Sequence, residues 1–225
     1  MQRRVPSWIR AALAAAVLIC MPLLHAGPAL AVNAFDREIM EFVQNNRTED
    51  LDHLMKTMSD EWKKENFLLV AVPVTLWGSN RSFLAVEESF KAITLAEAVV
   101  SPLKYVTGRK RPTGVTSRAN SSFPSSHAAT SFAAASSIGH IYPKARIPAY
   151  AVAALIAYSR IYNQRHYASD VIAGAGIGVV AAKVSRAYLS WLQIDREGLK
   201  QRLPFRIAVD SDGRGVLRIY ISRPL

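Results

Sequence analysis

The chain has 225 residues, of which 50% are hydrophobic and 20% charged, and its net charge is +11 at pH 7. This length suits one compact domain with a short targeting segment. The hydrophobic content excludes an intrinsically disordered chain. The positive charge favours an anionic partner: a nucleic acid, a membrane surface or a phosphorylated substrate.

The first 31 residues have the three regions of a secretory signal peptide. The start is basic, with Arg3, Arg4 and Arg10, and an apolar run follows over residues 11–24. The small residues Ala29 and Ala31 then supply a cleavage site. An uncleaved transmembrane helix is the alternative, but the apolar run is short for one. We therefore expect a signal peptide over 1–31 and an exported domain over 32–225, which would contain no cysteine and hence no disulfide.

Apolar residues at helical spacing predict helices along most of this domain. They are expected over residues 36–58 with a break near Asn45, and over 61–77, 83–107, 126–140, 146–162 and 170–192. Residues 206–221 alternate apolar and polar side chains around Ser211-Asp212-Gly213, which predicts a small β-hairpin. The expected fold class is all-α, a compact helical bundle with this hairpin at the C-terminus.

None of these predicted helices looks like a free-standing membrane span, because their uninterrupted apolar runs are short. The apolar runs 67–77, 147–158 and 171–182 each have about a dozen residues, whereas a bilayer requires roughly 20. The pattern favours buried helices of a soluble bundle, and a peripheral contact with a membrane stays open.

Charge is unevenly distributed within the predicted bundle. Residues 98–194 contain eleven Lys and Arg residues but a single acid, Asp170. A solvated basic face would explain many of the cations, but it does not explain a lone carboxylate among them. We expect that carboxylate to have a specific partner.

The first chemical motif lies at the predicted end of helix 83–107. Lys104 and Arg111 are seven residues apart, and Gly108 and Pro112 predict that the helix ends between them. A loop could then turn Arg111 back, so that two cations face one anion. By itself the motif is equally typical of a surface loop or a nucleic-acid contact.

The second motif, Pro124-Ser125-Ser126-His127, opens an Ala- and Ser-rich helix. Either serine is a suitable N-cap. The N–H groups of a first helical turn have no partner inside the helix and can bind phosphate. A capping serine pair with an incidental histidine is the simpler interpretation of this motif alone.

The third motif runs from Ser159-Arg160 to His166 and Asp170. A carboxylate near a histidine can hold one ring N–H and leave the other nitrogen free to attack. A purely structural His–Asp pair is the alternative.

Together and in this order, the three motifs resemble the signature of the type 2 phosphatidic acid phosphatase superfamily. That superfamily includes bacterial class A acid phosphatases and vanadium-dependent haloperoxidases, and its signature reads K-x6-RP, PSGH and SR-x5-H-x3-D. The resemblance covers roughly residues 83–192 and is greatest to exported bacterial members. Ser126 stands where the family usually has glycine.

The resemblance implies a phosphatase that hydrolyses phosphomonoesters, including lipid phosphates or polyprenyl (di)phosphates, through a phosphohistidine. It implies no metal and no cofactor, and a location in the periplasm or at the outer face of the cytoplasmic membrane. The catalytic residues would be His166 as nucleophile, His127 as acid and base, and Asp170 orienting His166. The phosphate-binding residues would be Lys104, Arg111, Ser125, Ser126 and Arg160.

Two other functions remain open from the sequence: a vanadate-dependent haloperoxidase and a basic nucleic-acid-binding protein. The short chain argues against the first, and the export signal with Asp170 argues against the second. We expect His53 and His140 to be structural, and Arg109, Lys110 and Arg165 to lie on the solvated surface.

Overall fold

The computed structural model describes residues 32–61, 78–115, 117–200, 206–211 and 217–222. The chain forms two compact units, Met1–Arg186 and Ala187–Leu225. The expected signal peptide and nearly all of the expected helix 61–77 lie outside the described residues.

The described part of the first unit is helical, as the apolar spacing predicts. Its helices are α2 (Ala34–Asn45), α3 (Glu49–Glu61), α5 (Asn80–Thr107), α6 (Ser126–Ile141), the short 3-10 helix η1 (Pro143–Ala145), α7 (Arg146–Tyr162) and the start of α8 (Ala168–Lys200). The break expected near Asn45 separates α2 from α3. The expectation of a helical bundle is confirmed.

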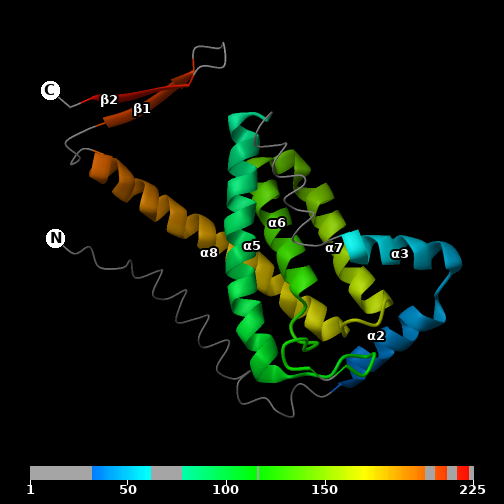
Figure 1. Ribbon diagram of the computed structural model, residues 1–225. Helices are drawn as coiled ribbons and strands as arrows, with labels where there is room; N and C mark the ends of the chain where they lie inside the picture. The colour runs from blue at the N-terminus through cyan, green and yellow to red at the C-terminus, as the bar shows by residue number, and fades with distance from the viewer. Residues whose placement is uncertain (1–31, 62–77, 116, 201–205, 212–216, 223–225) are drawn as a thin grey trace. The chain divides into compact units, whose positions relative to one another are not determined.

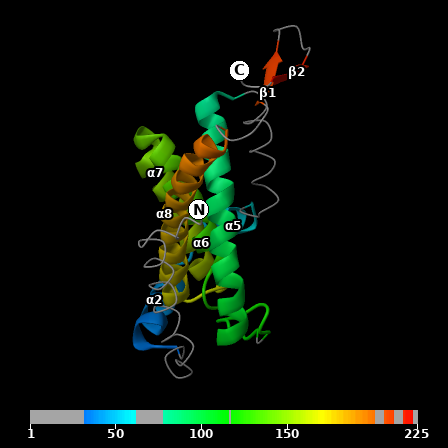
Figure 2. The same ribbon diagram turned by 90° about the vertical axis from the view of Figure 1, so that its left-hand side faces the viewer.

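Helix α6 lies between α5 and α7 and packs against both (Figures 1 and 2). Its buried positions are mostly Ala and Ser, so neighbouring backbones can approach closely. Two glycines of α8 meet it directly: a Cβ added at Gly174 would lie 2.4 Å from the carbonyl oxygen of Ser125, and one at Gly178 would lie 2.1 Å from that of Ala129. The first residues of α6 are therefore held against α8 by backbone contact.

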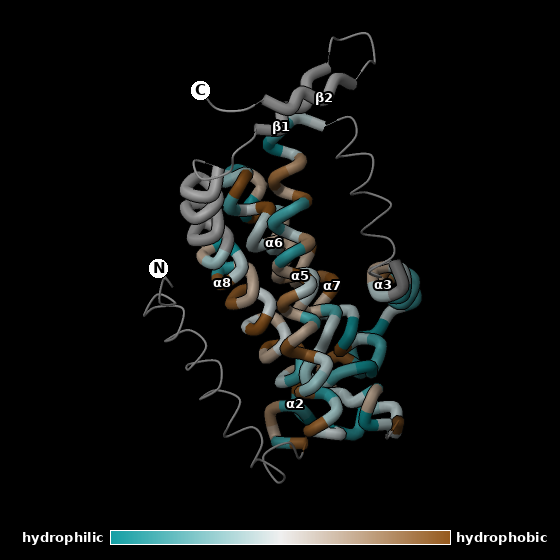
Figure 3. The backbone as a smooth tube through the Cα atoms, turned by 60° about the vertical axis from the view of Figure 1, so that its left-hand side comes forward, coloured by the Kyte–Doolittle hydropathy of each residue, from teal (hydrophilic) through white to brown (hydrophobic). Residues whose placement is uncertain are grey.

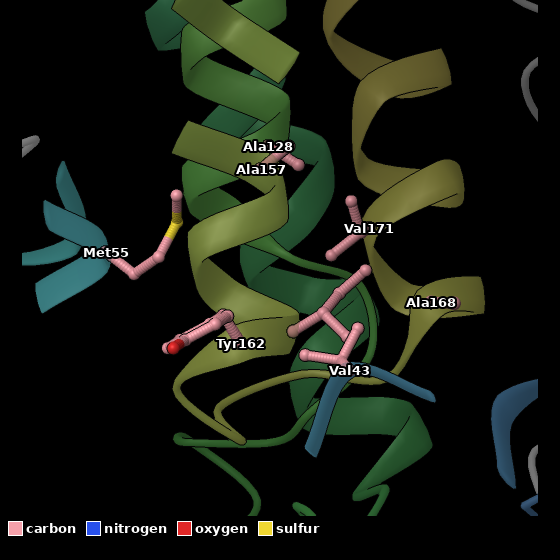
Figure 4. Packing of buried hydrophobic residues seen from close by; sticks show 8 residues of the cluster. Val43, Met55, Ala128, Ala157, Tyr162, Ala168 and Val171 are labelled. Atoms are coloured by element: carbon pink, nitrogen blue, oxygen red, sulfur yellow. The ribbon is translucent and has the colours of Figure 1, made fainter. Parts of the chain in front are cut away.

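Helices α2 and α3 pack against α7 near the end of the bundle that carries the α5–α6 and α7–α8 loops (Figure 1). A cluster of buried apolar residues joins five helices here. Figure 4 shows its members Val43, Met55, Ala128, Ala157, Tyr162, Ala168 and Val171. This core fixes the N-terminal helices to the elements that contain the second and third motifs.

Helix α8 is longer than the expected helix 170–192, because it continues to Lys200. Its segment Ala168–Tyr188 is long and apolar enough to cross a membrane, and it is the one such segment among the described residues. A buried core helix passes the same test. Hydrophobic residues are distributed along α5 and α8 in Figure 3, while α3 is largely hydrophilic.

The second unit contains the expected hairpin. Strands β1 (Arg206–Ser211) and β2 (Leu217–Ser222) pair antiparallel, from Arg206 opposite Ser222 to Ser211 opposite Leu217. The expected turn at Asp212-Gly213 lies outside the described residues.

Candidate active site

The first motif adopts the geometry that its glycine and proline predict. Helix α5 ends at Thr107, and Gly108 caps it in the left-handed conformation with its N–H on the carbonyl of Lys104. The Nζ of buried Lys104 donates to the carbonyl of Ser121 over 2.8 Å. Arg111, also buried, lies in the loop after α5.

The guanidinium of Arg111 is held in the α5–α6 loop from three sides. It donates to the carbonyl and side-chain oxygens of Asn120 over 3.0 and 2.6 Å, and to the carbonyl of Arg165 over 3.0 Å. These bonds fix the plane of the guanidinium, which matters because a guanidinium binds phosphate in a planar, bidentate geometry.

The second motif forms the N-terminus of α6. Ser125 is the N-cap, and its Oγ accepts from the N–H of Ala128 at 3.4 Å. The N–H of Ser125 itself donates to the carbonyl of Asp170 over 3.0 Å. The N–H groups of Ser126 and His127 belong to the first turn, where helix geometry provides no intrahelical acceptor. The start of α6 is therefore suited to binding phosphate, and it is hydrogen-bonded to α8.

The third motif spans the end of α7, a short loop and the start of α8. Arg160 is buried in the last turn of α7, and its Nη1 donates to both oxygens of Ser59 on α3. The loop turns at Gln164, a non-glycine residue with φ of 53°, whose amide donates to Gln44 of α2 over 2.6 Å. His166 follows and is 1% exposed.

These three motifs meet at one end of the bundle. The charges of Arg160, Lys104 and Arg111 all act on His127, as does His166. Six charged side chains are buried among the described residues: the cations Lys104, Arg109, Arg111 and Arg160, and the carboxylates Asp36 and Asp170. Cations that are buried together in this way are suited to binding an anion.

The tautomer of His166 follows from its hydrogen bond. Its Nδ1 lies 2.6 Å from the backbone carbonyl oxygen of Ser122. A carbonyl can only accept, so Nδ1 carries the proton and donates it. In the neutral ring Nε2 then keeps its lone pair, which is the state that a nucleophile needs.

Asp170 does not hold this N–H directly, in contrast to the sequence expectation. Its Oδ2 is 3.8 Å from Nδ1 of His166, beyond hydrogen-bond distance. Instead Oδ2 accepts from the hydroxyl of Ser122 over 2.5 Å and from the N–H of Tyr167 over 2.8 Å. Asp170 thus reaches His166 through Ser122.

Burial is the main cause of the pKa shifts in this site. It lowers the pKa of His166 to about 4; Asp170 opposes this shift, while Lys104 and Arg111 add to it. Burial lowers the pKa of His127 to about 3, with Arg160 the next largest cause. It also lowers the pKa of Lys104 to about 8. At neutral pH both histidines are therefore uncharged.

The expectation that Arg109 lies on the surface is wrong. Arg109 is buried between Asp36 of α2 and Asp170, 2.7 and 2.5 Å away. Sequence reasoning missed both Arg109 and Asp36, although it expected Asp170 to have a specific partner, and Arg109 is one. Lys110 and Arg165 are exposed, as expected, and His53 and His140 are exposed as well.

No group of three or more His, Cys, Asp and Glu side chains is placed to hold a metal ion in the described part of the chain. The groups gathered here are instead fixed cations and helix N–H groups, which bind anions.

Fold and site together define a helical protein with a buried, cationic, histidine-containing site. Residues 89–194 match the family model of the PAP2 superfamily. The match confirms the resemblance to type 2 phosphatidic acid phosphatases.

Among curated proteins, the chain is 38% identical over 96 residues to a lipid A 1-phosphatase of Porphyromonas gingivalis. That match covers 41% of this chain but only 21% of the relative, about a fifth of its length.

Two solved structures share the fold. LpxE of Aquifex aeolicus matches with a TM-score of 0.59 and 24% identity, over 69% of this chain and 97% of that one. The transmembrane PAP2-type phosphatidylglycerolphosphate phosphatase of Bacillus subtilis matches with a TM-score of 0.59 and 19% identity, over 78% and 96%.

Proposed function

We propose that this protein hydrolyses phosphate monoesters carried by lipids, through a phosphohistidine formed on His166. The observation that carries the proposal is the group of buried cations, Lys104, Arg111 and Arg160, gathered near a histidine whose Nε2 is available for attack. Such cations can bind the oxygens of a phosphate dianion. The cations stabilise the charge that develops on the transferring phosphoryl group.

The reaction would take place in two displacements. First, Nε2 of His166 forms a bond to phosphorus as the ester P–O bond breaks, and His127 gives a proton to the leaving alcohol oxygen. Then His127 takes a proton from water, whose oxygen attacks phosphorus and releases inorganic phosphate and His166. Lys104, Arg111 and Arg160 bind the phosphoryl oxygens in both steps, with Ser125 and the N–H of Ser126.

Substrate binding must raise the pKa of His127 before this residue can act as an acid. In the free protein the pKa of His127 is about 3, so at neutral pH this ring has no proton to give. A dianion placed among the same cations would offset their effect and raise the pKa of His127. The acid would then form chiefly where substrate is bound.

A lipid substrate is supported by the two phosphatases that the chain resembles, one for lipid A and one for phosphatidylglycerolphosphate. It also agrees with the large apolar side chains exposed on the bundle, including Phe90, Ile147 and Ile172. We propose that the protein is exported and acts at the outer face of the cytoplasmic membrane. The lipid A relative and the Bacillus subtilis structure are both phosphatases, so the haloperoxidase and nucleic-acid alternatives are not favoured.

The test is turnover by the purified full-length chain. We expect kcat/KM for a short-chain phosphatidate to exceed that for glycerol phosphate, with activity unchanged by EDTA and inhibited by vanadate. His166→Asn should lower the rate at least about a thousandfold and abolish the trappable phosphoenzyme, whereas His140→Asn, at an exposed position of α6, should not. A strong preference for glycerol phosphate would refute the lipid substrate. Loss of activity in EDTA, restored by a divalent metal, would refute the metal-free mechanism.

A further inference from the structure

Asp36 is an acid in the first turn of α2 with no exposed surface. Its Oδ1 accepts the N–H of Ser169 over 2.9 Å. Its Oδ2 accepts the hydroxyl of Ser169 over 2.8 Å and Nη2 of Arg109 over 2.7 Å. A buried carboxylate is tolerated only when it is paired in this way. Asp36 thus binds both the start of α8 and the loop after α5.

Arg109 connects Asp36 to the catalytic region. Its Nη1 donates to Oδ1 of Asp170 over 2.5 Å and to the hydroxyl of Ser169 over 2.8 Å. Its guanidinium also lies 4.6 Å from the centre of the Tyr167 ring. One planar cation therefore bridges two buried carboxylates, and the two N–H groups that face them fix its orientation.

The contacts continue from Asp170 to His166. The second oxygen of Asp170 accepts the hydroxyl of Ser122, and the carbonyl of Ser122 accepts Nδ1–H of His166. The ring of His166 is thus held at the end of a continuous chain of buried contacts that begins at Asp36.

From this geometry, we infer that Asp36 and Arg109 act as a positioning pair that holds Asp170, and through Ser122 the His166 ring, in the orientation for attack. The inference rests on the proposed function of His166. It makes α2, which precedes the matched segment 89–194, part of the catalytic apparatus. The pair itself binds no phosphate. Its loss should therefore lower kcat and leave anion affinity nearly unchanged.

The test uses the full-length chain with Asp36→Asn, Arg109→Gln, Arg109→Lys and the double variant Asp36→Asn/Arg109→Gln. We expect kcat to fall at least about tenfold in Asp36→Asn and about a hundredfold in Arg109→Gln, with Kd for vanadate within about threefold of the parent. The double variant should be no slower than Arg109→Gln, because the two residues act as a unit. Arg109→Lys should recover part of kcat because it keeps the cation.

Asp52→Asn is the matched control. Asp52 is also a carboxylate of the N-terminal helices. It accepts from Tyr162 and pairs with Arg47, and neither residue belongs to the chain of contacts that runs from Asp36 to His166. Its substitution should lower stability without the selective loss of kcat. Additive losses in the double variant, or equal losses of kcat and vanadate affinity, would overturn the inference.

A readout independent of turnover separates this inference from the proposed function. Nitrogen-15 NMR of the histidine rings should show the Nδ1–H form of His166 in the parent and a mixture of tautomers in Arg109→Gln. If the parent hydrolyses no phosphate ester, the proposed function fails, and the NMR comparison still decides the positioning pair. An unchanged His166 tautomer in Arg109→Gln would refute it.

Discussion

The His166 ring is surrounded by a carbonyl acceptor, a carboxylate and two cations, and it is almost fully shielded from water. Burial disfavours the charged imidazolium more than Asp170 favours it, so the ring stays neutral far below its ordinary pKa. Burial keeps the ring neutral and therefore able to attack. For the same reason it lowers the stability of the folded protein at acid pH.

The sign of that instability follows from linkage. The unfolded chain protonates this histidine near pH 6.5, while the folded protein does so only near pH 4. Between these values the unfolded state binds more protons, so the free energy of unfolding falls as the pH falls. We expect His166 to account for a loss on the order of 3 kcal/mol across this window.

Urea unfolding at intervals between pH 4 and pH 7.5 measures this effect. His166→Asn should reduce the slope of the unfolding free energy against pH by an amount that corresponds to up to one bound proton. His140→Asn, at an exposed position, should retain the slope of the parent. An unchanged slope in His166→Asn would show that the ring is already protonated in the folded protein.

At the scale of elements, the close contact of α8 with α6 positions the start of α6. Gly178→Ala would place a methyl group 2.1 Å from the carbonyl oxygen of Ala129 and 2.9 Å from the N–H nitrogen of Ala133. Both are backbone atoms that cannot rotate away, so the helices must separate. We expect a loss of about 1–3 kcal/mol in stability and a lower kcat, because α6 carries Ser125 and His127.

Gly176→Ala is the control for this experiment, since a Cβ at Gly176 meets nothing within 4 Å. The same change there should raise stability by about 0.5–1 kcal/mol through helix propensity. The measurement is the thermal unfolding of the two variants and of the parent under the same conditions. Equal effects at the two positions would mean that the helices do not approach this closely in solution.

On the scale of the whole molecule, charge and exposed apolar surface offer two different ways to bind a membrane. The net charge of +11 would attract anionic lipids, and salt screens such attraction. Large exposed side chains on α5, α7 and α8, such as Phe90, Ile147 and Ile172, provide an apolar contact that salt does not weaken.

We expect the apolar contact to dominate. The full-length chain should float with lipid vesicles in 1 M salt, and the Ile147→Glu/Ile172→Glu variant should float less. Leu51→Glu, on the largely hydrophilic α3, is the control and should leave flotation unchanged. Release of the parent by salt alone would assign the binding to charge.

Local signals in the sequence determined much of this molecule. Apolar spacing with cap residues such as Ser125 and Gly108 placed most helices, because a helix terminus depends on neighbouring residues. The order of the three motifs predicted which residues bind phosphate, because that chemistry lies in their side chains. The extent of α8 was underestimated because its last residues, 193–200, are mostly polar and lack the apolar spacing on which the prediction depends.

Only the tertiary structure decided how the site is held together. Asp36 and Arg109 are 73 positions apart, and no local pattern links a first-turn acid of one helix to a basic residue in a distant loop. The acceptor for His166 is a backbone carbonyl, that of Ser122, and every residue type offers such a group. Pairing over these distances depends on how α2, the α5–α6 loop and α8 pack. Burial then keeps the carboxylates paired with Arg109 and the His166 ring neutral, which is the protonation state that the proposed attack requires.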